Sequence, residues 1–206
     1  LLKFINQQII NQQIINQQII HHKIINVTMD FQNKVLSREL ASFLWKGHTV
    51  GTAESCTAGR IAEALVLTAG ASQYFRGGII CYHDDIKVNL LHVDAALIEE
   101  KTAVCEEVAI QMVKGACEVL GTELAIASTG WGGPSGGTKE NPVGTIFLAC
   151  GTKDDIVTLK LTEDQGRDKN LANATQRALE LLDQYLIARN TETEEEKAPR
   201  IVDLES

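Results

Sequence analysis

The chain has 206 residues, of which 44% are hydrophobic, 22% charged and 5% aromatic, and its formal net charge is −8 at pH 7. This composition is typical of a globular protein large enough for one α/β-sized domain, and no run of about 18 apolar residues is present that would form a membrane-spanning helix. The negative charge excludes a nucleic-acid-binding protein that relies on a generally basic surface.

Residues 1–28 differ from the rest of the sequence, because the motif Ile-Asn-Gln-Gln-Ile recurs there with a period of five. This period matches neither the helical nor the strand repeat, so no continuous apolar face forms, and no unbroken apolar core of a signal peptide is present. We therefore expect a low-complexity disordered extension over 1–28 and one domain over 29–190. An acidic disordered tail is expected over 191–206, where six acids accompany two basic residues.

The periodicity of apolar residues predicts the elements of the central domain. Phe31, Leu40 and Leu44 belong to a helical pattern that Gly47 ends. In chain order, the patterns predict helices over 30–46, 56–69, 84–91, 102–120 and 169–188, and strands over 48–53, 78–82, 124–128, 143–150 and 156–162. Ser55 or Thr57 is the expected N-cap of the second helix, and Gly70 its expected end.

Alternation of strands and helices in the first half predicts parallel strands with helices on both faces, and the closing hairpin makes the sheet mixed. The expected fold class is therefore α/β, a three-layer α/β/α sandwich with a mixed, mostly parallel sheet. Ser55, Tyr82 and Thr129 each lie at the carboxyl end of a predicted strand. They should therefore meet at one edge of the sheet, where open α/β sheets bind their ligands.

The cysteines and histidines indicate neither disulfides nor a metal site. The five cysteines form no CxxC pair, and no two histidines have helical i, i+4 spacing. We therefore expect reduced thiols in a cytoplasmic protein, with no metal and no cofactor.

Three residues from two segments are candidates for catalysis. Ser55, at a strand–helix junction, is either a nucleophile facing a cleft or an ordinary helix cap, and Cys56 ranks below it because no histidine base is adjacent. Lys87 lies in the first turns of a predicted helix, where the helix dipole and burial favour a neutral amine that could take a proton from serine, with Tyr82 assisting. The alternative is a surface lysine beside a partly buried tyrosine.

The segment from Thr129 to Thr138 contains five glycines in ten residues. Glycines allow the backbone to approach a ligand closely and to direct its amides at an anion. The segment is neither a dinucleotide fingerprint nor a P-loop, and a merely flexible loop is the alternative. Arg167 would complete a phosphate clamp, or form a salt bridge with a neighbouring acid.

Taken together, several motifs resemble the CinA C-terminal domain family, which includes stand-alone nicotinamide-nucleotide amidases. The motifs are Thr-Ala-Glu-Ser-Cys-Thr at 52–57, Tyr82 with Lys87, Thr129-Gly130 with Gly133-Pro134, Gly136-Gly137-Thr138, and Pro142-Val143-Gly144-Thr145. The resemblance spans about residues 30–188 and implies hydrolysis of nicotinamide mononucleotide to nicotinate mononucleotide and ammonia without a metal.

The resemblance also assigns roles to residues of this chain. It makes Ser55 the nucleophile, with Tyr82 and Lys87 as the assisting pair. The residues that it makes candidates for substrate binding, together with Arg167, are Thr57, Thr129, Gly130, Gly133, Gly136, Gly137 and Thr138. The expected partner is a small pyridine nucleotide, with neither nucleic acid nor a membrane, and a homodimer is the expected assembly.

The sequence departs from the family pattern at three places. Ala58 replaces the first of two glycines, and Trp131-Gly132 replaces a small apolar pair. The indole of Trp131 would either stack on a pyridine ring or partly occlude the pocket. Leu171 stands where family members commonly have a second arginine, which removes half of the expected phosphate clamp. A nucleotide-binding or regulatory module of the same family, without efficient turnover, is therefore the alternative function.

Overall fold

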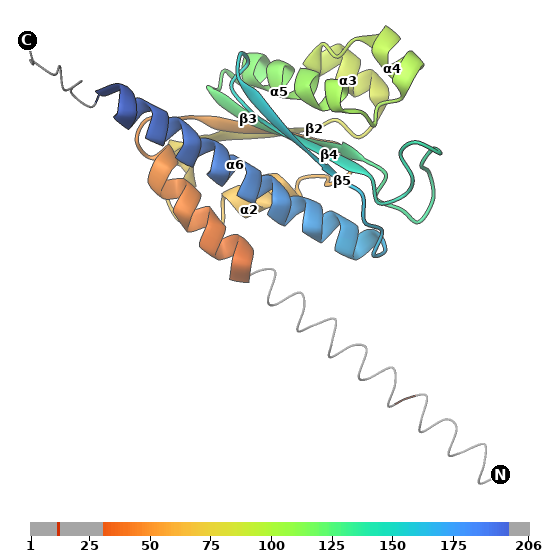
Figure 1. Ribbon diagram of the computed structural model, residues 1–206, viewed down its shortest axis with the longest axis horizontal. Coiled ribbons are helices and arrows are strands. Elements are labelled where there is room, and N and C mark those ends of the chain that lie inside the picture. Colours follow the sequence, from red (N-terminus) through yellow and green to blue (C-terminus); the bar gives the residue numbers. More distant parts are fainter. Residues whose placement is uncertain (1–11, 13–30, 198–206) are drawn as a thin grey trace, which may run out of the picture.

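A five-stranded sheet forms the middle layer of the computed structural model, which describes residue 12 and residues 31–197 (Figure 1). The strands lie in the order β2-β1-β3-β4-β5. Their bounds are Val50–Glu54 (β1), Phe75–Ile80 (β2), Leu124–Gly130 (β3), Ile146–Gly151 (β4) and Ile156–Leu161 (β5). β1 pairs in parallel with β2 and β3, whereas β4 pairs antiparallel with β3 and β5, so the sheet is mixed as predicted.

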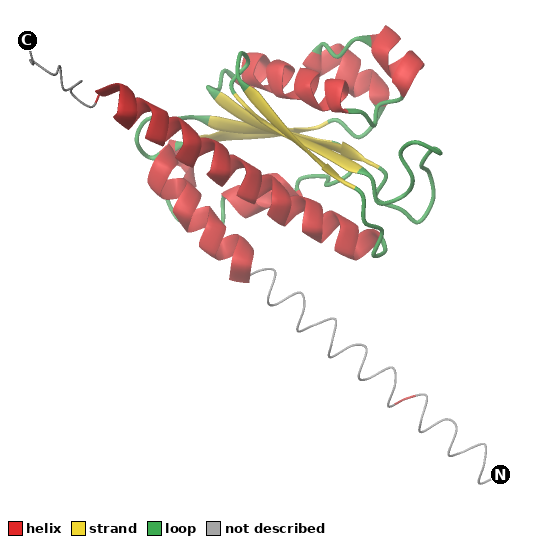
Figure 2. Cartoon of the chain, in the orientation of Figure 1, coloured by secondary structure: helices red, strands yellow, loops and turns green. Residues whose placement is uncertain are grey.

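Helices cover both faces of the sheet and complete the predicted α/β/α sandwich (Figure 2). The helical residues 31–44, together with α2 (Arg60–Leu65) and α6 (Arg167–Lys197), cover one face. The other face carries α3 (Asp84–Leu91), α4 (Ala95–Lys101) and α5 (Glu106–Leu120), and a short 3-10 helix, η1 (Ala71–Gln73), precedes β2.

Alternation along the central strand β3 divides the apolar residues between two cores. Leu124 and Ile126 belong to the core shared with α6, and Ala125 and Ala127 to the core shared with α5. Successive side chains of a strand point to opposite faces, so a fully apolar strand must be covered on both. The continuous apolar character of β3 therefore requires the three layers.

The predicted helix over 56–69 is wrong at both ends, because α2 covers only Arg60–Leu65. Ala58 and Gly59 have φ values of 51° and 98°, a left-handed conformation that an α-helix does not accommodate. Gly59 occupies the N-cap position, so neither Ser55 nor Thr57 caps this helix. Gly70 precedes η1 instead of ending α2.

Other boundaries differ less from the prediction. The strand predicted at 78–82 begins earlier, at Phe75, and is an edge strand with alternately half-buried and exposed residues, so Tyr82 lies beyond its end. The predicted helix 102–120 begins at Glu106, and α4 before it was not predicted. The helix at 84–91 and its bounds are confirmed.

The last helix is longer than predicted. α6 continues to Lys197, beyond residue 188 and into the segment expected to be a tail. Residues 198–206, and all of residues 1–28 apart from Gln12, lie outside the described residues.

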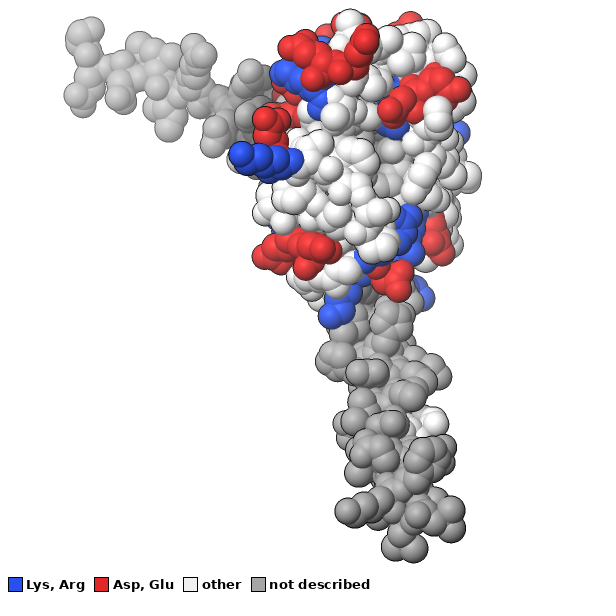
Figure 3. Space-filling model, turned by 90° about the vertical axis from the view of Figure 1, so that its right-hand side faces the viewer, with Lys and Arg blue, Asp and Glu red and all other residues white. Residues whose placement is uncertain are grey.

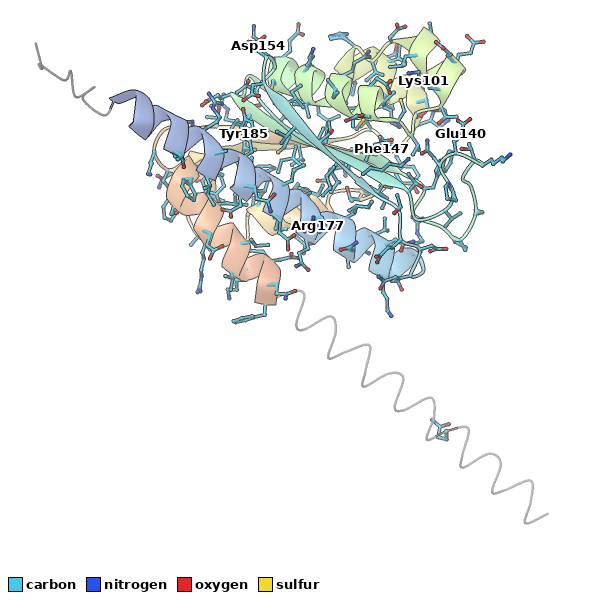
Figure 4. The ribbon with its side chains drawn as sticks, viewed as in Figure 1. Lys101, Glu140, Phe147, Asp154, Arg177 and Tyr185 are labelled. Carbon is cyan, nitrogen blue, oxygen red and sulfur yellow. The ribbon has the colours of Figure 1, made fainter. Side chains whose placement is uncertain are left out.

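The β4–β5 hairpin lies at one end of the sheet. The glycine-rich loop, residues 129–145 from the end of β3 to the start of β4, lies at the other. Asp154 marks the hairpin turn and Glu140 the loop (Figure 4). No described helix is both long enough and apolar enough to cross a bilayer. The five cysteines, all within residues 31–197, are buried and unbridged.

Candidate active site

A cavity of about 560 Å³ lies where β1, β2 and β3 end. Ser55, Tyr82 and Lys87 all line it, so the structure brings together the three candidates from two segments of the sequence. The other predicted residues in its wall are Thr129, Gly130, Gly133 and Arg167. Figure 3 shows the end of the molecule that lies at the right of Figure 1, where acidic and basic side chains surround a largely uncharged central area.

Ser55 directly follows β1, and its backbone still pairs with β3. Its amide donates a hydrogen bond to the carbonyl of Ser128 at 2.9 Å. The side chain is buried, yet no residue within 31–197 forms a hydrogen bond with its hydroxyl. Because the helix begins only at Arg60, the cap interpretation is wrong, and the hydroxyl is available to the cavity.

Glu54, which the sequence analysis missed, holds the turn that carries Ser55. Its carboxylate is 1% exposed and accepts four hydrogen bonds. The donors are Thr57 Oγ1 at 2.7 Å, Gly59 N at 2.9 Å, Ile61 N at 3.1 Å and Ala62 N at 2.8 Å. The amides at the start of a helix lack partners within the helix, and a buried carboxylate satisfies them. The sequence signal that could have indicated Glu54 is its position as an acid between a β-prone run and a predicted helix.

Thr57 lies outside the wall of the cavity. Its hydroxyl donates to Glu54 and accepts from Ser128 Oγ at 2.7 Å, and the residue is buried. Thr57 therefore supports the turn, and its hydroxyl is already engaged.

Cys56 also lines the cavity but is a poor nucleophile. Burial raises the pKa of its thiol to about 12. The thiolate is the reactive form of cysteine, and almost none is present near neutral pH. This supports ranking Ser55 above Cys56.

Lys87 is 1% exposed, which excludes the surface-lysine alternative. Its Nζ donates hydrogen bonds to Asp84 Oδ1 at 3.1 Å and to the carbonyl of Tyr82 at 3.4 Å. Both partners come from the turn that begins α3, so the first turns of this helix direct the amine toward the β2 end of the cavity.

Arg167 connects Tyr82 to the glycine-rich loop. Its Nη2 donates to Tyr82 Oη at 3.3 Å, and its Nη1 donates to the carbonyl of Gly133 at 2.8 Å. Tyr82 is 56% exposed, so its ring lies at the mouth of the cavity. Within the described residues Arg167 forms no ion pair with an acid, so the salt-bridge alternative is wrong.

Hydrogen bonds hold the glycine-rich loop in a defined conformation. Thr129 Oγ1 donates to the carbonyl of Ala103 at 2.7 Å, and Asn141 Nδ2 donates to that of Val104 at 3.1 Å. Thr138 and Asn141 close a turn, with Thr138 N donating to the Asn141 carbonyl at 2.8 Å. The loop is therefore tied to the segment before α5.

The loop glycines divide into two groups. Gly130, Gly132 and Gly133 line the cavity, whereas Gly136 and Gly137, like Thr138, lie outside its wall. A Cβ at Gly130 would come within 2.6 Å of Ile146 Cγ1, so close packing against β4 requires glycine at this position.

Leu171 belongs to the core beneath α6 and is buried. A Cβ at Gly132 would lie 3.0 Å from its Cδ2, so the loop rests on this leucine. Leu171 lies one turn of α6 after Arg167, at the position where a second arginine was expected. This position therefore makes an apolar contact with the loop instead of adding a second guanidinium.

No three His, Cys, Asp or Glu side chains within the described part of the chain gather in a way that would hold a metal ion. The cavity wall offers hydroxyl, phenol, amine and guanidinium groups.

Comparisons with known proteins match the same region. Residues 33–186 match the profile of the CinA C-terminal domain. A CinA-like protein of Citrifermentans bemidjiense is 39% identical over 163 residues, which are 79% of this chain and 38% of that protein. A CinA-like protein of Gloeobacter violaceus is 37% identical over 158 residues, 76% of this chain and 37% of that protein. The chain thus spans less than two-fifths of the length of these relatives.

Solved structures match over nearly their full length. The competence/damage inducible protein CihA of Agrobacterium tumefaciens is 34% identical with a TM-score of 0.70, covering 73% of this chain and 93% of that one. The competence damage-inducible protein A of Klebsiella pneumoniae is 31% identical with a TM-score of 0.72, covering 75% of this chain and 97% of that one.

Proposed function

The chain belongs to the CinA C-terminal domain family, and from this membership we propose that it is an amidohydrolase that converts nicotinamide mononucleotide to nicotinate mononucleotide and ammonia. The observation that carries the proposal is the presence of Ser55, Tyr82 and Lys87 in the wall of one cavity. Its volume of about 560 Å³ is within the usual range for small-molecule sites, and polar groups from several segments line it.

In the proposed reaction, Ser55 Oγ attacks the carboxamide carbon while its proton passes to Lys87 Nζ. The tetrahedral intermediate collapses when this proton moves to the amide nitrogen, so ammonia leaves and an ester to Ser55 remains. Water then attacks the ester with the same proton acceptor, which releases the carboxylate product and restores the serine. Every proton that Lys87 accepts is returned within the cycle.

Asp84 has the role of the third member of a triad in this proposal. Its carboxylate is 3.1 Å from Lys87 Nζ and lines the same cavity. A carboxylate at this distance orients the amine and stabilises the ammonium that forms when serine loses its proton.

The turn after Ser55 supplies a candidate donor for the oxyanion. Cys56 lines the cavity, and no other residue within 31–197 accepts a hydrogen bond from its amide. An available amide directly after a nucleophile can stabilise the negative charge of a tetrahedral intermediate. Glu54 holds this turn in place and therefore acts as a positioning residue.

Arg167 is the candidate for binding the phosphate of the nucleotide. A guanidinium has five N–H donors, and two of its nitrogens already donate to Gly133 and Tyr82. The remaining donors face no acid of the described residues and are available to an anion.

Measurement of ammonia release tests the proposal. The wild type should release ammonia from nicotinamide mononucleotide, and Ser55→Ala and Lys87→Met should each lower kcat by about 1,000-fold or more. Methionine keeps most of the buried volume of Lys87. Ser42→Ala is the matched control, because Ser42 is exposed and, among the described residues, its hydroxyl donates only to the carbonyl of Glu39. Full activity in either site variant would refute the assigned roles.

The buried Leu171 favours one alternative, a nucleotide-binding module without efficient turnover. Calorimetry would then show saturable nucleotide binding in the wild type, with no ammonia released. Saturable turnover would exclude this alternative.

A further inference from the structure

Trp131 and Tyr82 are the aromatic residues in the wall of the cavity, and the backbone of Trp131 is fixed at both ends. Its amide donates to the carbonyl of Thr145 at 2.8 Å, and its carbonyl accepts from the amide of Gly144 at 2.8 Å. Trp131 also directly follows β3, the parallel neighbour of the strand that ends beside Ser55. The indole is therefore presented from the same rim as the hydroxyl.

Two contacts restrict the ring itself. Gly136 has a φ of 96°, and a Cβ there would lie 2.6 Å from Trp131 Cε3, so the loop backbone packs directly against the indole. The ring also packs on the apolar cluster beneath α5 and is half-buried. An aromatic side chain that is held in this way loses little further entropy when it binds a ligand.

The wall of the cavity combines apolar and polar side chains. Val104 belongs to the apolar cluster on which Ile98 and Trp131 pack, and polar groups come from Ser55, Lys87, Asp84, Tyr82 and Arg167. A ligand that suits this wall has a flat ring attached to a polar, hydrolysable group.

The hydrogen bonding of the indole does not explain why a tryptophan occupies this position. Nε1 is buried and has no partner within the described residues. An unpaired buried donor is unfavourable, and a smaller apolar residue would fill the wall without it. The property that a tryptophan adds here is its electron-rich ring surface.

We propose that Trp131 is a specificity-determining residue that binds the cationic pyridinium ring of the substrate by stacking, with the carboxamide of that ring reaching Ser55. In a pyridine mononucleotide the ring nitrogen carries the ribose, so the ring is planar and positively charged. Tryptophan attracts such a cation more strongly than other aromatic residues do. The inference rests on the proposed function for the identity of the ring, but the binding can be measured without turnover.

The first test is a fluorescence titration of the full chain carrying Trp45→Phe and Ser55→Ala. Trp45 is 47% exposed, lies outside the cavity wall and binds Gly70 through its indole, so its removal leaves Trp131 as the remaining tryptophan. Nicotinamide mononucleotide should quench the fluorescence with saturation. Absence of quenching, when calorimetry shows that the nucleotide binds, would overturn the proposal.

The second test separates stacking from occlusion by calorimetry in the Ser55→Ala chain. Trp131→Leu should raise the Kd for nicotinamide mononucleotide about 10- to 100-fold, and Trp131→Phe should restore most of the affinity. The matched ligand is the 1,4-dihydro form of the same mononucleotide, whose ring is uncharged and which should bind at least about 10-fold more weakly. Equal affinity of the two ligands, or unchanged or tighter binding by Trp131→Leu, would overturn the proposal.

Turnover distinguishes this inference from the proposed function. With Ser55 present, Trp131→Leu should raise KM and leave kcat within a few-fold of the wild type, because the ring contact is the same in the ground state and the transition state. Quenching without ammonia release would refute the proposed function and support the inference. Ammonia release with an unchanged KM in Trp131→Leu would refute the inference and support the proposed function.

Discussion

Replacement of Glu54 by glutamine tests whether this buried carboxylate holds the turn that carries Ser55. Oε2 accepts hydrogen bonds from Thr57, Gly59 and Ile61, and Oε1 accepts one from Ala62. A glutamine amide has one oxygen, which can take the place of Oε2. Its NH2 group would then face the amide of Ala62, donor against donor.

The cost follows from these contacts. The lost bond leaves a buried amide unpaired, which costs about 1–3 kcal/mol, and the three remaining bonds become neutral ones, which together add about 1 kcal/mol. We therefore expect Glu54→Gln to lower the free energy of unfolding by about 2–4 kcal/mol. A domain with an ordinary stability of about 5–15 kcal/mol remains folded at this cost, so its activity can be measured.

Urea denaturation gives the change in unfolding free energy. Ammonia release, measured well below the urea concentration at the unfolding midpoint, gives the change in kcat. We expect kcat to fall because the turn at 55–59 loses its anchor. Glu63→Gln is the matched control, because Glu63 is exposed in the first turn of α2, and its loss should cost less than about 1 kcal/mol. If Glu54→Gln were no more destabilising than this control, the anchoring role would be refuted.

Three further predictions concern other groups. Iodoacetamide at pH 7.4 should leave Cys56 unmodified in the native protein. Burial raises the pKa of its thiol to about 12, so the reactive thiolate forms only as the pH approaches that value. Rapid alkylation of Cys56, detected by peptide mass spectrometry, would contradict this prediction. Gly115→Ala should lower the free energy of unfolding, measured by urea denaturation, by about 1–3 kcal/mol. The new Cβ would lie 2.1 Å from the carbonyl oxygen of Leu91 and would push α3 away from α5. Unchanged stability would show that the helices adjust freely. The hydrogen bond from Asn170 and that from Gly166 hold the pKa of Asp164 below its usual value of 3.8, so its contribution to stability is present above that pH and is lost as the pH falls through the lower, folded value. Asp164→Asn should therefore flatten the acid side of the stability–pH curve, and an unaltered curve would count against this reasoning.

The sheet edge and α3 were predictable because their signals are local. Asp84 and Asp85 open a helix that the sequence bounds correctly, and the continuous apolar run of β3 requires cover on both faces. Parallel strands end at a common edge, so the convergence of Ser55 and Tyr82 follows from the predicted strand directions.

The start of α2 was not predictable from local propensity. The four hydrogen bonds of Glu54 hold residues 57–62 around a buried carboxylate, and Ala58 takes a left-handed conformation that its side chain disfavours. These hydrogen bonds to one carboxylate therefore override the helical preference of 56–59. α4 was missed because none of its residues is fully buried, so it presents no clear apolar stripe.

The partners of the site residues depend on distances that a sequence does not contain. Arg167 binds Gly133, which is 34 positions away, and Tyr82, which is 85 positions away. The sequence indicated Arg167 as a binding candidate, but only the three-dimensional structure shows that it connects the loop to the tyrosine.

The antiparallel β4–β5 hairpin has a practical consequence for experiments on this protein. Its turn at 152–155 is mostly exposed and lies at the end of the sheet away from the glycine-rich loop (Figure 4). A peptide tag, a surface-attachment residue or a reporter domain inserted between Lys153 and Asp154 would leave the cavity unobstructed. The turn therefore offers an internal anchoring point for immobilisation or single-molecule work.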